Sequence, residues 1–235
     1  MAGKIIFDIE TAGKDFDSLD EHTRQYLTKY AESEEDLAEV KNSLSLYPLT
    51  SQIVAIGMLN PESGKGAVYF QAPSAAIEPF EEDRIRYEPG TEKEVLERFW
   101  QTIKSYEQFI TFNGRCFDCP FILIRSAFHG IKAARDLMPN RYSGCHLDLL
   151  DQLTFFGAVR RRFSLDMWCR FFGIQSPKES VDGSEVKNLF ETGRYLDIAR
   201  YCAGDVRATA ELYNYWQTYM KPVPERMLWD KNVRS

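Results

Sequence analysis

Residues 5–11 read IIFDIET, an apolar run that carries two acidic residues spaced two positions apart. Side chains alternate between the faces of a β-strand, so Asp8 and Glu10 lie on the same side of such a strand. Two carboxylates at one edge repel each other unless a cation lies between them. Hard divalent ions bind oxygen ligands of this kind, and Mg²⁺ binds through a few carboxylates together with substrate phosphates. The stretch therefore indicates metal-dependent phosphate chemistry.

Two later stretches add carboxylates to this pair. Residues 112–118, FNGRCFD, end in Asp118, and residues 201–209, YCAGDVRAT, contain Tyr201 and Asp205 four positions apart. On a helix, that spacing places the phenol and the carboxylate on one face. Taken singly, each stretch has an ordinary interpretation: Asp118 is a helix N-cap after a turn, and Tyr201 is a buried tyrosine beside a surface acid. The three stretches in this order favour one shared site.

This set of residues resembles the DEDDy class of 3′-5′ exonucleases, which have four catalytic carboxylates and a tyrosine in the third motif. The histidine subclass has a histidine five residues before the last aspartate, where this chain has Arg200. The resemblance is closest to the proofreading exonuclease domain of family-B DNA polymerases and to stand-alone relatives of it, and it covers residues 4 to about 216. It implies an α/β, ribonuclease-H-like fold, with a mixed sheet flanked by helices, and a single exonuclease domain over residues 1–235.

The resemblance also implies a mechanism. Two divalent cations, Mg²⁺ or Mn²⁺, promote hydrolysis of the phosphodiester at the 3′ end of a single strand and release nucleoside monophosphates. In this family pattern Asp8 bridges both ions, Glu10 and Asp205 hold the ion that carries the nucleophile, and Asp118 acts through water on the second ion. Tyr201, whose phenol has an ordinary pKa of ~10, positions the attacking water by a hydrogen bond. DNA is favoured over RNA, with a 3′-5′ exoribonuclease and an inactive nucleic-acid-binding module of the same fold as alternatives.

Candidate substrate contacts follow from the same resemblance. Each lies beside a motif or in one of the family's Ser/Thr-Leu-x-x-hydrophobic and Lys-x-x-hydrophobic elements. A phenyl ring suits stacking on an unpaired base, and a lysine suits a phosphate. Arg160, Arg161 and Arg162 form a basic run that either tracks the strand backbone or is a solvated helix end. The predicted nucleic-acid contacts are Thr11, Asn113, Phe117, Ser164, Leu165 and Lys178.

Composition agrees with one catalytic domain. A chain of 235 residues with 44% hydrophobic content buries a full core. Its 29 basic and 35 acidic residues give a net charge of −6, so we expect weak, metal-assisted binding of a strand end. Five scattered cysteines, with no secretory segment recognised ahead of them, favour a cytoplasmic chain with free thiols. No run of ~18 apolar residues predicts a membrane span, and the sequence says nothing of protein partners.

Hydrophobic periodicity predicts a mixed α/β order. Residues 14–49 form a charged, helix-prone insertion, interpreted either as a wall of the active-site cleft or as a solvated excursion. The tail from residue 221 contains two prolines and does not continue a helix. Strands are expected at 4–9, 52–59, 66–71, 108–113 and near 145–149, and helices at 92–106, 119–130, 149–156, 164–173 and 194–219.

Two classes of protein compete with the exonuclease. An aspartyl-phosphate phosphomonoesterase also begins with a strand that ends in Asp-x-acid, but it has aspartate where this chain has Glu10, and it does not explain Tyr201 with Asp205. A non-catalytic module that has kept the fold would usually have lost a carboxylate, and all four are present. Stepwise release of nucleoside monophosphates distinguishes the exonuclease from both.

Overall fold

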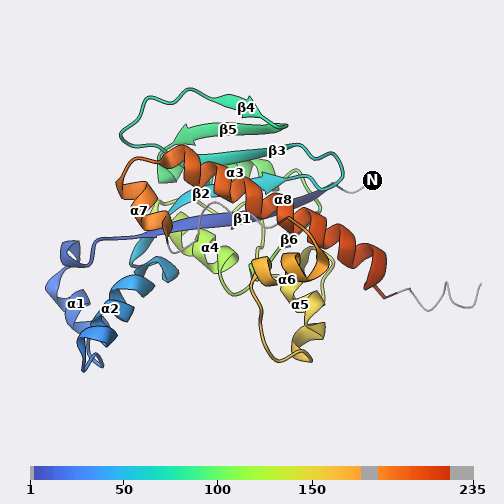
Figure 1. Cartoon of the computed structure of the whole chain (residues 1–235). Helices are drawn as coiled ribbons and strands as arrows, with labels where there is room; N and C mark the ends of the chain where they lie inside the picture. Colours follow the sequence, from blue (N-terminus) through green and yellow to red (C-terminus); the bar gives the residue numbers. More distant parts are fainter. Residues whose placement is uncertain (1–2, 176–184, 223–235) are drawn as a thin grey trace, which may run out of the picture.

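The computed structural model of the chain describes residues 3–175 and 185–222. Within this part, seven strands form one mixed sheet in the spatial order β4-β5-β3-β2-β1-β6-β7 (Figure 1). β1 pairs antiparallel with β2 and parallel with β6, so it lies inside the sheet. The strands are β1 (Lys4–Gly13), β2 (Ser51–Leu59), β3 (Gly66–Gln71), β4 (Phe80–Glu82), β5 (Ile85–Gly90), β6 (Gln108–Thr111) and β7 (His146–Asp148).

Helices cover both faces of this sheet (Figure 1). α8 crosses one face over β1, β2 and β3, and α3 and α4 lie against the other face, while α6 and α7 pack against α8. The predicted α/β fold, a mixed sheet flanked by helices, is confirmed. The helices are α1 (Glu21–Leu27), α2 (Glu34–Ser43), α3 (Glu92–Ile103), α4 (Asp118–Phe128), α5 (Leu149–Leu153), α6 (Leu165–Phe172), α7 (Val186–Glu191) and α8 (Tyr195–Tyr219), with 3₁₀ turns at Phe16–Ser18, Leu44–Leu46 and Phe155–Gly157.

The two faces of β1 have different neighbours. Ile5, Phe7 and Ile9 belong to the apolar core formed with α3 and α4, whereas Ile6 belongs to the core under α8. Because side chains alternate, the two acidic residues of β1 face α8. A slip of one residue would push both carboxylates into the α3–α4 core and lose about 1.5–3 kcal/mol for each apolar side chain exposed. The hydrophobic pattern thus fixes the register that positions the acids.

The sequence patterns predict the main elements to within a few residues but miss the hairpin of β4 and β5. Its turn places Asp83 and Arg84 at φ 48° and 66°, the left-handed region that a type I′ turn requires. Such turns are usually signalled by Asn-Gly or Asp-Gly, and this one contains no glycine. The short helix α7 is also absent from the expectations. α8 ends at Tyr219, as the prolines of the tail predict, and residues 223–235 lie outside the described part.

The insertion after β1 is fixed by hydrogen bonds near its C-terminal end, whereas its helices are exposed to solvent. Thr11 Oγ1 donates to the carbonyl of Ser45 (2.7 Å), and Thr50 Oγ1 donates to the carbonyl of Leu44 (2.8 Å), a residue that is 1% exposed. No residue of α1 or α2 is buried, and both helices project from the end of β1 away from α8 (Figure 1). This arrangement favours the solvated excursion over a wall of the site.

The insertion also accounts for most of the chain's net negative charge. Residues 14–49 contain nine acidic and four basic residues, a net charge of −5 out of −6 for the whole chain. In Figure 1 the insertion lies on the left of the molecule, and α5 and α6 lie on the right. The remaining residues are therefore close to neutral, with a net charge of −1.

Gly57 lets α8 lie close to the sheet beside the acidic pair. It lies on β2 opposite Asp8 of β1. A Cβ at this position would lie 3.0 Å from Cys202 Sγ and 3.1 Å from Val206 Cγ1, both on α8. These separations are tighter than ordinary van der Waals contacts, so a side chain here would push α8 away from β1.

Gly57→Ala is expected to lower the free energy of unfolding by about 1–3 kcal/mol, the usual cost of overpacking a core. Urea denaturation of the purified variant measures this loss. Gly144→Ala is the matched control, because a Cβ there meets nothing within 4 Å; its change is expected within about 0.5 kcal/mol. Equal stability of Gly57→Ala and the wild-type protein would show that the packing of α8 does not require a residue without a side chain at position 57.

Candidate active site

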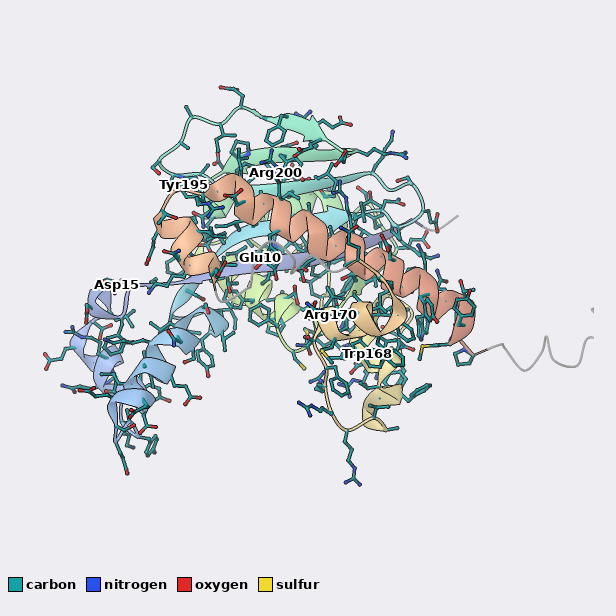
Figure 2. The ribbon with its side chains drawn as sticks, in the orientation of Figure 1. Glu10, Asp15, Trp168, Arg170, Tyr195 and Arg200 are labelled. Carbon is teal, nitrogen blue, oxygen red and sulfur yellow. The ribbon has the colours of Figure 1, made fainter. Side chains whose placement is uncertain are left out.

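Asp8 and Glu10 lie side by side under α8, where β1 extends past the end of its neighbour β6. β6 pairs with β1 only from Lys4 to Ile6, so the following edge of β1 has no strand partner on that side. Glu10 is 7% exposed and Asp8 is partly buried. Figure 2 shows Glu10 on β1 beneath α8. Because β6 ends early, this edge of β1 has room for a carboxylate from another segment.

Asp118 occupies this space at the first residue of α4. It is 3% exposed, and its Oδ1 accepts a hydrogen bond from the backbone N–H of Ile9, at 3.1 Å. Ile9 lies between the two acids of β1, so this bond brings the third carboxylate to the edge of the same strand. The alternative assignment of Asp118 as an N-cap is wrong, because Phe117 occupies the cap position.

α8 supplies the remaining two groups from above the sheet. Tyr201 is 7% exposed, and Asp205 lies one turn further along the same face of the helix. Burial, followed by the negative charges of Asp205, Glu10 and Asp8, raises the pKa of Tyr201 above its usual value. The phenol therefore stays protonated at neutral pH. Arg200, where the histidine subclass has its histidine, points instead to Glu82 of β4 (Nε to Oε2, 2.9 Å).

The four carboxylates repel one another in this enclosed space. Burial raises the pKa of Asp8 well above its usual range, and the charges of Asp118, Asp205 and Glu10 raise it further. Burial likewise raises the pKa of Asp118 to about 7, against the opposing hydrogen bond from Ile9. All four acids therefore act on one volume, and a positive charge placed there would relieve the repulsion.

These residues fit a divalent cation. Donor atoms of Asp8, Glu10 and Cys202 all lie within 4.8 Å of one another. Carboxylate oxygens suit a hard divalent ion, whereas the Cys202 sulfur is a softer ligand. Cys202 was not placed near the site by the sequence analysis. The available signal was its position three residues before Asp205, which places these two residues on the same face of α8.

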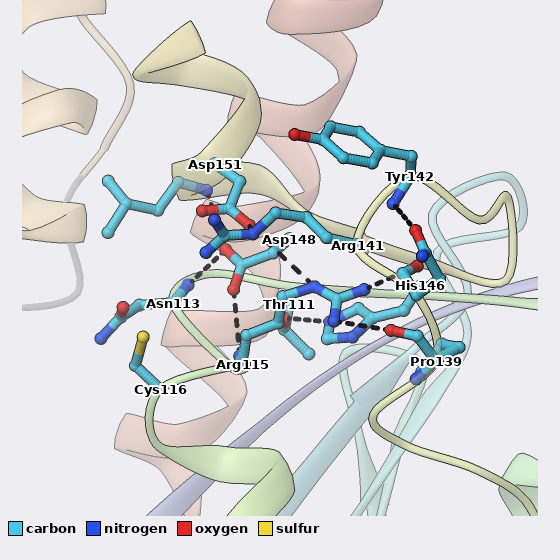
Figure 3. A network of polar contacts seen from close by, with 12 residues as sticks. Thr111, Asn113, Arg115, Cys116, Pro139, Arg141, Tyr142, His146, Asp148 and Asp151 are labelled. Carbon is cyan, nitrogen blue, oxygen red and sulfur yellow. Dashed lines mark hydrogen bonds and ion pairs between the residues drawn. The ribbon is translucent and has the colours of Figure 1, made fainter. Parts of the chain in front are cut away.

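Asp148, at the end of β7, holds the loop that leads to Asp118. Its Oδ1 accepts from the backbone N–H of Asn113 at 2.9 Å, and its Oδ2 accepts from the N–H of Arg115 at 3.0 Å (Figure 3). The same carboxylate caps α5 through the N–H of Leu150 at 3.1 Å. Asn113 adopts a left-handed φ of 64°. One carboxylate with three backbone donors therefore fixes the turn between β6 and α4.

Two arginines extend this network toward the surface. Asp151 lies beside Arg141 (Oδ2 to Nε, 3.0 Å) and Arg115 (Oδ2 to Nε, 4.0 Å). Arg115 also donates to the carbonyl of Pro139, at 2.9 Å. Figure 3 shows these groups in one cluster next to Cys116. Residues 112–118, the second motif, are thus held on both sides.

The predicted substrate contacts are placed as follows. Asn113 and Phe117 lie in the loop that leads to Asp118, and the Phe117 ring contacts Phe121 at a centroid distance of 5.3 Å. Thr11 adjoins Glu10, but its hydroxyl is bonded to the insertion. Ser164 caps α6 by accepting from the N–H of Met167 at 3.4 Å, and Leu165 packs on the core under α8. Lys178 lies outside the described residues. All six stay predictions.

The fold and the site together define a nuclease-like α/β protein with a carboxylate-rich centre. Residues 50–226 match the family described as predicted 3′-5′ exonucleases related to the exonuclease domain of PolB. The matched segment spans more than half of the chain and includes Asp118, Tyr201 and Asp205, while β1 precedes it. The chain belongs to this family.

Individual relatives agree with this assignment. An uncharacterised protein of Methanocaldococcus jannaschii is 34% identical over 129 residues, covering 51% of this chain and 70% of that protein. A DNA polymerase of Desulfurococcus sp. is 30% identical over 172 residues, covering 62% of this chain and 21% of the polymerase.

The same fold occurs in a solved structure. The family B DNA polymerase from the hyperthermophilic archaeon Pyrobaculum calidifontis aligns with a TM-score of 0.56 and 16% identity, over 92% of this chain and 25% of that chain. This likeness confirms the predicted fold class. The chain spans a quarter or less of the two polymerases named here. Among the described residues, no helix combines the length and apolar character needed to cross a bilayer.

Asp118→Asn is expected to stabilise the metal-free protein at pH 8 more than at pH 5. The raised pKa of Asp118, about 7, means that its acid form is favoured in the folded state, so stability is lost as the pH rises from about 4 through 7. Asparagine keeps an acceptor for the Ile9 N–H and carries no charge.

Thermal melting in EDTA, followed by circular dichroism at both pH values, measures the difference. Addition of Mn²⁺ at pH 8 should raise the melting temperature of the wild-type protein more than that of the variant. A difference between the two proteins that is the same at both pH values would contradict the electrostatic account.

Proposed function

We propose that this protein is a metal-dependent 3′-5′ exonuclease that releases nucleoside monophosphates from single-stranded ends, with DNA favoured over RNA. One observation carries the proposal: β1, the start of α4 and α8 bring four mutually repelling carboxylates and a protonated tyrosine to one volume. Membership of the exonuclease family supports the reaction class. The similarity to DNA polymerases supports DNA as substrate.

The carboxylates have distinct places around the proposed centre. Asp8 is influenced by the charges of the other three acids, so it is the residue best placed to contact two ions at once. Glu10 and Asp205 would bind beside it, and Asp118, which already accepts the Ile9 N–H, would act through water. The chemistry supplied by two bound divalent cations, Mg²⁺ or Mn²⁺, is neutralisation of the scissile phosphate and acidification of a water molecule.

Tyr201 would act by hydrogen bonding. Its hydroxyl stays protonated at neutral pH because its pKa is raised, and it lies within hydrogen-bonding reach of Asp205. A neutral phenol in this position holds and orients a water molecule that approaches the phosphate. Abstraction of a proton would require the phenolate, which the surrounding negative charges disfavour.

Asp8→Ala is expected to abolish Mn²⁺-dependent degradation of a 5′-labelled single-stranded DNA, because it removes the carboxylate on which the charges of the other three act. The wild-type protein should produce a stepwise ladder and nucleoside monophosphates, both resolved by electrophoresis and chromatography. Matched DNA and RNA strands give the sugar preference. Wild-type protein that binds the strand without shortening it would identify the inactive module instead, and equal rates for wild type and variant would refute the site.

Tyr201→Phe is expected to slow cleavage by about 10- to 1000-fold, the effect of losing one water-positioning hydroxyl. Mn²⁺ affinity should be unchanged, because the phenol is not a ligand here. Single-turnover cleavage and calorimetric titration test the two halves separately, with Asp205→Ala as the control that loses metal affinity. A Tyr201→Phe variant that loses as much metal affinity as Asp205→Ala would contradict the assigned role.

A further inference from the structure

The loop of residues 154–163, TFFGAVRRRF, connects α5 to α6 and exposes two consecutive aromatic rings. Phe155 is 58% exposed and Phe156 is 40% exposed. The Phe156 ring contacts Tyr142, itself 77% exposed, at a centroid distance of 5.1 Å. Large apolar side chains normally leave water on folding, so a loop that exposes two consecutive aromatic rings, one of them in contact with the exposed Tyr142, indicates an interaction site.

The backbone of this loop holds the rings outward at a cost. Phe155 and Phe156 adopt left-handed φ angles of 49° and 55°, and Gly157 follows at 99°. For a residue with a bulky side chain, this region is unfavourable by roughly 1–2 kcal/mol. Phe155 and Phe156 stay 58% and 40% exposed, so burial recovers only part of that cost. Strain of this kind is typical of segments that bind something else.

The loop is also basic. Arg160, Arg161 and Arg162 are all exposed, and residues 154–163 contain no acidic residue. Among the described residues, none of these three arginines lies within 4.0 Å of a carboxylate oxygen. The insertion, with its net charge of −5, lies on the other side of the molecule (Figure 1). The positive charge is therefore available for an anionic partner.

The loop adjoins the second motif. Arg162 Nη1 lies 3.2 Å from the Sγ of Cys116, two residues before Asp118. The other end of the loop is fixed by Thr154, whose Oγ1 donates to the carbonyl of Leu150 at 2.7 Å and whose carbonyl accepts from the N–H of Val159 at 3.0 Å. A chain that leaves the carboxylate centre past Cys116 would therefore reach the loop next.

We propose that residues 154–163 form a binding platform for single-stranded nucleic acid, on which Phe155 and Phe156 stack unpaired bases while Arg160, Arg161 and Arg162 contact phosphates. The inference rests on the proposed exonuclease function for the position of the 3′ end, because the platform takes nucleotides upstream of the one that is cleaved. Exposed aromatic faces stack only on bases that are free of a duplex. The platform thus selects a single strand.

The test compares four variants, each with two or three substitutions, in their affinity for a single strand and in their hydrolysis of a short substrate. Phe155→Asn with Phe156→Asn removes the rings and suits the left-handed backbone, and its control is Tyr26→Asn with Tyr30→Asn, two exposed aromatics of the insertion (74% and 82%). Arg160→Gln, Arg161→Gln and Arg162→Gln remove three charges, and the control is Arg24→Gln, Lys29→Gln and Lys41→Gln, which removes the same charge from the insertion.

Fluorescence anisotropy in EDTA measures the affinity for a labelled 12-nucleotide oligothymidylate. Turnover is measured by Mn²⁺-dependent hydrolysis of the p-nitrophenyl ester of thymidine 5′-monophosphate, a substrate that is too short to reach the loop. The aromatic variant should lose about 10- to 100-fold in affinity for the strand, with an unchanged or raised melting temperature. The arginine variant should lower the slope of log K against log salt by about 2. Both should hydrolyse the ester within twofold of the wild-type rate, and both controls should bind the strand normally.

Unchanged strand affinity in the aromatic variant, or an equal loss of affinity in its control, would overturn the proposal. So would a lower melting temperature in the aromatic variant, since the rings would then be structural, or an equal loss of affinity for duplex DNA. Wild-type protein that binds the strand through the loop but fails to hydrolyse the ester or shorten the strand would refute the proposed nuclease function and leave the platform standing.

Discussion

The repulsion between four carboxylates in one partly buried space is the constraint on which the rest of this structure depends. β1 must present Asp8 and Glu10 to the same side, which the alternation of Ile5, Ile6, Phe7 and Ile9 between two cores ensures. α8 must then lie close above them, and Gly57 leaves the room for it. Each of these arrangements raises the free energy of the metal-free protein, because like charges are brought together away from water. A positive charge bound among the four carboxylates would relieve this repulsion.

Local periodicity made most of this predictable. Asp8 and Glu10 are two residues apart on a strand, and Tyr201 and Asp205 are four apart on a helix, so their faces follow from the sequence. The hairpin of β4 and β5 was not predictable, because its turn uses Asp83 and Arg84 at positive φ without a glycine. The bond from Ile9 to Asp118 joins residues 109 positions apart, and no short-range pattern encodes such a contact.

Two aspartates that lie on strands have opposite environments in this structure. Asp148 receives three backbone N–H donors and organises the loop of the second motif. Asp8 faces three other acids. The same side chain thus serves as a structural anchor at one strand end and as a candidate ligand on another strand, and the number of donors around it decides which. Sequence position alone does not distinguish the two.

The uneven placement of charge has a further consequence. The net charge of −5 in residues 14–49 and the exposed Arg160, Arg161 and Arg162 between α5 and α6 contribute an electric dipole along the direction that separates the insertion from these helices in Figure 1. In the field of a polyanion, such a dipole turns the arginine side forward before contact and holds the insertion away. Encounters would then be preoriented at low ionic strength and lose that orientation as salt shortens the range of the field.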